Sequence, residues 1–115
     1  MIAKPLETSV RYRPDAVVID LYGDIDAFAE DALHAAYAEA DKKNLPTVLL
    51  NFGDVDYINS IGIALIVSLL AQARKAGRRL LASGLSDHYK EIFQITRLAD
   101  FITIFPNETS ALQGF

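Results

Sequence analysis

The distribution of hydrophobic and polar positions divides the chain into blocks that predict strands and helices. Short apolar runs rich in β-branched residues are typical of strands, and longer runs with apolar residues three or four positions apart are typical of helices. A polar-apolar connection is expected over residues 53–58. Strands are predicted at 6–12, 16–22, 47–52, 79–83 and 101–105, and helices at 27–43, 61–76, from 86 onwards and from 107 to 112.

The predicted elements follow one another in the order ββαβαβαβα. A turn at Pro14 joins the first two strands, which are therefore expected to form an antiparallel hairpin. The later strands are separated by helices, and strands joined through a helix pair in parallel by right-handed crossovers. The fold class is therefore α/β, with a mixed sheet of about five strands.

The helix predicted at 27–43 has recognisable ends. Asp26 can cap its first N–H groups, Asn44 can adopt the left-handed conformation that ends a helix, and Pro46 cannot continue one. Because apolar residues recur at helical spacing, one face is expected to pack on the sheet. This face comprises Ala29, Leu33, Ala36, Tyr37 and Ala40.

Composition narrows the class of protein. Of the 115 residues, 51% are hydrophobic and 23% are charged, which suits one globular core. A net charge of -4 argues against a general nucleic-acid-binding surface. Cysteine is absent, so disulfides and zinc–thiolate sites are excluded, and a cytoplasmic protein is expected. The N-terminus does not resemble a signal peptide, and the apolar stretch 61–71 is about half of the roughly 20 residues that span a bilayer, so no membrane partner is expected.

The sequence offers few groups for catalysis. The only histidines are His34 and His88, and neither has a sequence neighbour that would form a catalytic pair. The spacing of Asp31 and His34 occurs in metal sites, but one such pair supplies at most two ligands. Nucleotide-binding and nucleophile-elbow motifs are absent. We therefore expect a protein that is not an enzyme and has no catalytic residues, resident metal or cofactor.

Four aspartates stand near the predicted carboxyl ends of two strands. Asp24 and Asp26 follow the second strand, and Asp54 and Asp56 follow the third. Because parallel strands joined by right-handed crossovers end at a shared edge of the sheet, these carboxylates are expected to gather around Ser60. They are interpreted as loop and capping residues, with a magnesium site as the alternative.

Ser60 stands immediately before an unusually apolar helix. As an N-cap, its hydroxyl would accept a hydrogen bond from the N–H of Gly62 or Ile63. Residues 61–70 are apolar almost all round, so part of this helix is expected to be a docking surface. A helix N-terminus also stabilises a phosphate, and phosphorylation of Ser60 would place about -2 of charge beside that surface and oppose binding.

Four segments, in order along the chain, resemble the STAS domain of bacterial anti-sigma factor antagonists. They are residues 18–26 (VIDLYGDID), 48–52 (VLLNF), 56–62 (DYINSIG) and 92–98 (IFQITRL), and the resemblance extends over essentially the whole chain. In that family the third segment is the phosphorylation motif. The resemblance implies a single STAS domain over residues 1–115, with helices packed mainly on one face of the mixed sheet.

The resemblance also implies a function. Such proteins bind an anti-sigma factor that is also a serine kinase, in a partner-switching pathway that a metal-dependent serine phosphatase resets. Carried onto this chain, Ser60 is the implied phosphorylated residue, and Asp26 and Asn51 match family positions near that serine. The implied partner-binding residues are Asp24, Asp26, Asn59, Ser60, Ile61, Gly62, Ile63 and Ile66.

Two residues of the motif depart from the family pattern. Asn59 replaces an acidic residue and removes one negative charge beside the acceptor, and Ile61 removes a second possible acceptor. The family expectation is a monomer, with a dimer as the alternative, and no direct contact with nucleic acid. The alternative function is that of an unphosphorylated scaffold or accessory subunit, as in stressosome-like assemblies or lipid-transport complexes.

Overall fold

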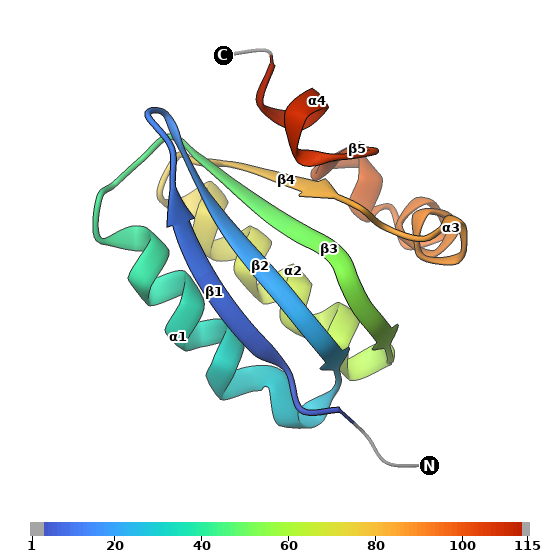
Figure 1. Ribbon diagram of the computed structural model, residues 1–115. Helices are drawn as coiled ribbons and strands as arrows, with labels where there is room; N and C mark the ends of the chain where they lie inside the picture. The colour runs from blue at the N-terminus through green and yellow to red at the C-terminus, as the bar shows by residue number, and fades with distance from the viewer. Residues whose placement is uncertain (1–3, 114–115) are drawn as a thin grey trace.

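A computed structural model describes residues 4–113 of the chain, and its strands and α-helices follow the predicted order (Figure 1). The strands are β1 (Glu7–Tyr12), β2 (Ala16–Ile25), β3 (Thr47–Ile58), β4 (Arg79–Ser83) and β5 (Thr103–Phe105). The α-helices are α1 (Glu30–Asp41), α2 (Ser60–Lys75), α3 (Asp87–Ile95) and α4 (Glu108–Leu112), and two short 3-10 helices are η1 (Ala27–Ala29) and η2 (Leu98–Asp100).

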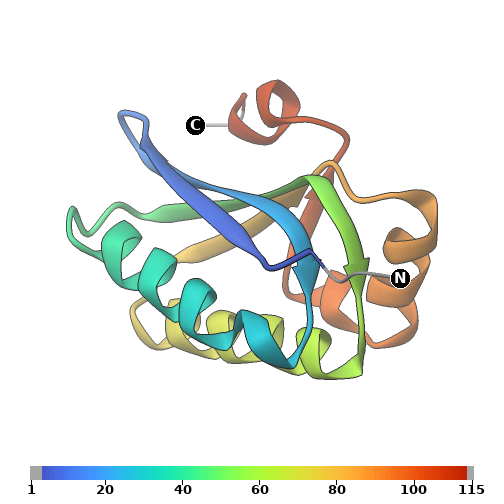
Figure 2. The same cartoon turned by 60° about the horizontal axis from the view of Figure 1, so that its bottom comes forward.

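The strands form one sheet in the order β1-β2-β3-β4-β5. β1 and β2 are antiparallel, as expected for a hairpin, and each later pair is parallel. Figure 2 shows α1 and α2 side by side under the sheet, with the short helix α4 above it. The structure therefore confirms the predicted α/β class, with a mixed five-stranded sheet and helices mainly on one face.

Two apolar clusters hold these layers together. The larger lies between the sheet and the helices below it, where alternate residues of β2 (Val17, Ile19 and Leu21) pack with residues of α1 and α2. The smaller lies on the opposite face and contains Val18, Leu49, Leu81 and Ala111 of α4. Because the central strands are covered on both faces, they are nearly continuous apolar runs. The predicted inner face of the first long helix is confirmed, since all five of its residues are buried.

Two strands are longer than predicted. The segment 53–58 is not a connection, because β3 continues to Ile58 and stays paired with β2. Likewise Gly23 does not end the second strand: it has φ +104 within β2, which continues to Ile25. The register shifts between Asp20 and Tyr22 and again between Gly23 and Asp24. Such irregularities let a strand absorb residues of low strand propensity while its pairing continues.

Two other predicted elements have different bounds. The helix predicted at 27–43 is divided into η1 and α1, and Asp26 caps η1 by accepting a hydrogen bond from the N–H of Phe28 at 3.0 Å. α1 ends at Asp41, two residues before the predicted end, and Asn44 adopts the predicted left-handed conformation (φ 49) in the turn that follows. The last strand begins at Thr103, later than predicted, because Phe101 completes η2 with a bond from its N–H to Leu98 O.

Candidate functional site

Ser60 is the first residue of α2, and Asn59 is the residue that caps this helix. Asn59 Oδ1 accepts a hydrogen bond from the N–H of Gly62 at 2.9 Å, and its backbone oxygen accepts one from Ile63 at 3.0 Å. The prediction that Ser60 is the N-cap is therefore wrong, because the amide of Asn59 already occupies that position. Ser60 is exposed, and its hydroxyl makes no hydrogen bond within residues 4–113. The hydroxyl is thus open to a reacting partner.

The ends of two neighbouring strands bring the predicted residues together. Ile25 and Ile58 are partners at the ends of β2 and β3, and the N–H of Asn59 donates to Ile25 O at 3.2 Å. Asp26 and Asn59 therefore follow the carboxyl ends of two adjacent strands, at the same end of the sheet. η1 and the first turn of α2 lie side by side there (Figure 2). The structure thus brings Asp26 close to the segment that carries Ser60.

Gly62 makes this approach of α2 to β2 sterically feasible. A Cβ atom added to Gly62 would lie 2.0 Å from Ile25 O and 2.8 Å from the carbon of the same carbonyl. Real Cβ atoms do not approach backbone so closely, so only glycine fits here without movement of the helix. The glycine of the motif therefore sets how closely the helix of Ser60 packs on the sheet.

The predicted partner-binding residues of α2 differ in their exposure. Ile61 is 50% exposed, and Ile63 is half-buried. Gly62 is buried against the end of β2. Ile66 is completely buried, so its predicted place on the docking surface is wrong: its side chain belongs to the core beneath α2.

Two aromatic residues near Ser60 were not among the predicted contact residues. Phe28 of η1 is 91% exposed, and Tyr57, near the end of β3, is 51% exposed. Together with Ile61 they place three large apolar side chains on segments adjoining Ser60. We call Ser60 and these three residues (Phe28, Tyr57 and Ile61) the Ser60 surface. The sequence signal that could have located this surface is Phe28, a large aromatic residue two positions after the capping residue Asp26.

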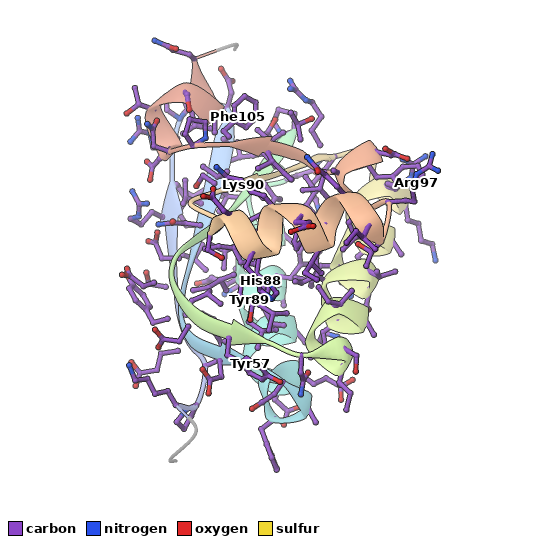
Figure 3. All side chains as sticks on the ribbon, turned by 90° about the vertical axis from the view of Figure 1, so that its right-hand side faces the viewer. Tyr57, His88, Tyr89, Lys90, Arg97 and Phe105 are labelled. Atoms are coloured by element: carbon purple, nitrogen blue, oxygen red, sulfur yellow. The ribbon has the colours of Figure 1, made fainter. Side chains whose placement is uncertain are left out.

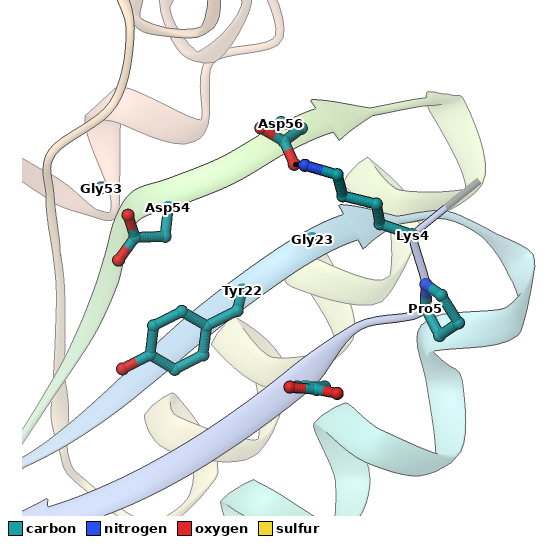
Figure 4. A pocket seen from close by; sticks show the side chains of 8 residues that line it. Lys4, Pro5, Tyr22, Gly23, Gly53, Asp54 and Asp56 are labelled. Atoms are coloured by element: carbon teal, nitrogen blue, oxygen red, sulfur yellow. Dashed lines mark ion pairs between the residues drawn. The ribbon is translucent and has the colours of Figure 1, made fainter. Parts of the chain in front are cut away.

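The four aspartates do not gather around Ser60 as a group: Asp26 lies near the serine's segment, but the other three make contacts elsewhere. Asp24 Oδ2 accepts a hydrogen bond from the N–H of Lys4 at 3.1 Å, and Asp56 Oδ2 pairs with the same lysine's Nζ at 3.1 Å. Asp54 and Asp56 line an open hollow of about 590 Å³ over β2 and β3, shown in Figure 4. The prediction failed because it treated residues 53–58 as a loop, whereas the extended β3 carries both side chains along the sheet. Within the described residues no group of three or more metal-ligating side chains is found.

Asn51 also lies away from Ser60. It is seven residues before the end of β3, which at about 3.3 Å per residue is roughly 23 Å along the strand. Its Nδ2 donates to Asp20 Oδ1 at 2.7 Å, and its Oδ1 accepts from the N–H of Gly53 at 3.0 Å. The expected proximity of Asn51 to the serine is therefore wrong, and its contacts are those of a structural residue.

A polar network surrounds Asp20 on the outer face of the sheet. Asp20 is only 5% exposed and accepts hydrogen bonds from Arg11 Nε at 2.6 Å, from Arg11 Nη2 at 3.0 Å and from Ser9 Oγ at 3.1 Å. Arg11 also pairs with Glu108 of α4. The pKa of Asp20 lies below its ordinary value of 3.8, chiefly because Arg11 donates to the charged carboxylate and despite the opposing effect of burial.

Replacing Asp20 by asparagine is expected to lower the free energy of unfolding by about 1.5–3 kcal/mol, the usual range for hydrogen bonds to a charged group. Because the folded pKa is lowered, the stabilisation is fully present above the unfolded pKa, near pH 4, and is lost as the pH falls from there through the lower folded pKa. Urea unfolding at several pH values should therefore show a steeper acid loss for the unaltered chain than for Asp20→Asn. Asp54→Asn, at an exposed carboxylate, is the control; equal acid dependence of the Asp20→Asn variant and the unaltered chain would contradict the account.

The two histidines lie on the surface and do not form a paired site. His34 is exposed on α1, and His88 is exposed on α3, where its ring lies 4.8 Å from that of Tyr89. Within residues 4–113 neither histidine forms an ion pair with a carboxylate.

None of the helices in the described part of the chain is long and apolar enough to cross a membrane.

The sheet thus carries an exposed serine at the start of the helix that follows its central strand. The model of the STAS domain matches residues 7–111, so the chain belongs to the STAS domain family. Several curated relatives are named anti-sigma factor antagonists. A putative anti-sigma factor antagonist BtrV of Bordetella bronchiseptica is 30% identical over 86 residues, which cover 75% of this chain and 72% of that protein. An anti-sigma-B factor antagonist of Listeria monocytogenes is 29% identical over 90 residues, covering 78% and 79% of the two chains.

Solved structures show the same fold. The crystal structure of an anti-sigma factor antagonist from Mycobacterium paratuberculosis has a TM-score of 0.82 at 18% identity and covers 97% of both chains. The Bacillus cell fate determinant SpoIIAA in its phosphorylated form has a TM-score of 0.71 at 20% identity, covering 93% of this chain and 97% of the other.

Proposed function

We propose that this chain is an anti-sigma factor antagonist that binds an anti-sigma factor with serine kinase activity and is released when the kinase phosphorylates Ser60. The observation that carries the proposal is the exposed Ser60 hydroxyl, which Asn59 leaves free by capping the helix in its place. The names of the curated relatives support the class of partner. A structural neighbour solved in both unphosphorylated and phosphorylated forms supports reversible phosphorylation.

The Ser60 surface explains how one phosphate would end the interaction. Exposed aromatic and aliphatic side chains are suited to a partner's apolar contacts, since they are buried when the partner binds. A phosphate adds about -1.5 to -2 of charge, which must lose water or meet like charge if that surface is to be covered. Asp26, at the same edge, adds to this negative field.

The fold itself is expected to tolerate the modification. A phosphate on the first residue of α2 lies at the positive end of the helix dipole, where an anion is stabilised by about 0.3–1 kcal/mol at an exposed site. Because the Ser60 hydroxyl makes no hydrogen bond within residues 4–113, its modification breaks none there. Release of the partner would then need no unfolding of the domain.

The remaining parts of the proposal follow from this switch. We propose that a metal-dependent serine phosphatase removes the phosphate, that the chain acts without catalytic activity of its own, and that it works as a monomer in the cytoplasm. Both partners would reach the same exposed residue, since the kinase must place its active site over the Ser60 hydroxyl and the phosphatase must place its own over the phosphate formed there. The curated relatives, which are regulatory proteins by name, support this role.

The test is phosphorylation of the purified chain by its serine kinase and ATP, mapped by mass spectrometry. We expect one phosphate, on Ser60, and none on the Ser60→Ala variant. Ser68→Ala, which changes a half-buried serine two turns further along α2, should be phosphorylated as the unaltered chain is. If Ser60 stays unmodified and the chain is recovered with a membrane transporter instead, the role is that of a scaffold or accessory subunit, and the proposal is wrong.

A further inference from the structure

The second half of β3 has a strand on only one side. β3 pairs with β2 as far as Ile58, but with β4 only from Thr47 to Asn51. Beyond Asn51 the outer edge of β3 therefore has no neighbouring strand among residues 4–113, and this unpaired edge continues to the segment that carries Ser60. Unpaired edges leave backbone N–H and C=O groups without ladder partners, and proteins commonly cover them with another element.

The helix α3 lies beside this edge and contacts it at two places. Phe93, which is completely buried, packs edge-on against Phe52 with 5.9 Å between the ring centroids. One helical turn earlier, Tyr89 Oη accepts a hydrogen bond from the N–H of Ile58 at 2.9 Å. Figure 3 shows Tyr89 between α3 and the end of β3, with Tyr57 nearby on the strand. The first contact anchors α3, and the second links it to the residue that ends β3.

The Tyr89 hydrogen bond holds the last residue of β3, just before the segment that carries Ser60. Ile58 precedes Ser60 by two residues, and Asn59 between them caps α2. On one side the segment is held by β2, through the bond from Asn59 N–H to Ile25 O. On the other side, the Ile58 N–H is held by the Tyr89 hydroxyl. The segment is therefore fixed from both sides, and the bond from α3 depends on one phenolic oxygen.

We propose that Tyr89 is a positioning residue for phosphorylation of Ser60. Its hydroxyl fixes the end of β3, so that the serine is presented to the kinase in one orientation. The ring of His88 lies against that of Tyr89 and helps to hold it in place. This inference rests on the proposed function, because it concerns the rate of the same reaction. Tyr89 does not need to touch the kinase or ATP for this role.

The test compares Tyr89→Phe, which keeps the ring and removes only the hydroxyl, with the unaltered chain. Loss of one hydrogen bond is worth about 0.5–1.5 kcal/mol, a factor of roughly 2 to 13. We expect hydrogen exchange of the Ile58 amide to become faster by about that factor. The kcat for phosphorylation of Ser60 should fall by a similar factor, with KM nearly unchanged, because the Ser60 surface is intact. Tyr22→Phe is the matched control, since it removes the hydroxyl of an exposed tyrosine on another part of the sheet.

The outcomes separate this proposal from the proposed function. If the kinase modifies the unaltered chain and Tyr89→Phe at equal kcat, the positioning role is wrong while the switch stands. Unchanged exchange at Ile58 would also overturn it. If the unaltered chain is never phosphorylated, the proposed function fails and the role of Tyr89 fails with it. A fall in stability of Tyr89→Phe with unchanged kcat would assign the hydroxyl a structural role only, which also contradicts the proposal.

Discussion

The Ser60→Ala variant is expected to stay bound to its serine kinase in the presence of ATP, whereas the unaltered chain is released. Alanine cannot accept the phosphate, and the apolar part of the Ser60 surface is unchanged by the substitution. A doubly charged group beside a buried apolar contact is expected to weaken binding by about 100-fold, or roughly 2.7 kcal/mol. The complexes can be separated by size-exclusion chromatography after incubation with ATP or with ADP.

Ser68→Ala provides the matched comparison for this variant, because it removes a hydroxyl from the same helix without altering the acceptor. In the presence of ATP, the Ser68→Ala variant should be released from the kinase as the unaltered chain is. If Ser60→Ala is released just as readily, phosphorylation of Ser60 is not the event that ends binding. Loss of binding in ADP would instead show that the hydroxyl itself contributes to the contact.

Replacing Gly62 by alanine is expected to lower the free energy of unfolding by about 3 kcal/mol, the upper part of the range for overpacking a tight contact. The added Cβ would lie 2.0 Å from Ile25 O, so the first turn of α2 must move away from the end of β2. The same movement would weaken the Asn59 cap, which bonds to the N–H of Gly62. Urea denaturation measures the loss.

Gly77→Ala separates this clash from the general cost of replacing a glycine. Gly77 has φ +73, but nothing lies within 4 Å of an added Cβ, so only backbone strain of about 1 kcal/mol is expected. The account requires Gly62→Ala to be the more destabilising of the two. Equal losses would show that the close packing of α2 on β2 does not govern the stability of this edge.

The sequence was most informative where local chemistry decides the structure. The left-handed Asn44 in the turn after α1, Ser86 as the cap of α3 and Asn107 as the cap of α4 could each be predicted from the residue type and its neighbours. The inner face of α1 followed from helical spacing. The segment carrying Ser60 and Gly62 could also be located, because an apolar helix follows it directly.

Features that depend on contacts between distant segments could not be predicted. The polar residues of 53–58 favour a loop locally, yet β3 continues through them because β2 pairs with them. This extension moved Asn51, Asp54 and Asp56 away from the expected site. The sequence places Ile66 on the docking surface because its helix is apolar on almost every side. Helical spacing alone therefore cannot distinguish the residues that pack in the core from those on the exposed face, and Ile66 is buried. The bond from Ile58 to Tyr89 joins residues 31 positions apart and leaves no local signal.

The most direct test of the switch is the affinity of one preparation of this chain for its serine kinase before and after phosphorylation of Ser60. Isothermal titration with the kinase in ADP gives both values, and mass spectrometry fixes the extent of modification. We predict that phosphorylation weakens binding by about 100-fold while circular dichroism shows an unchanged fold. Equal affinity of the two forms would contradict the account.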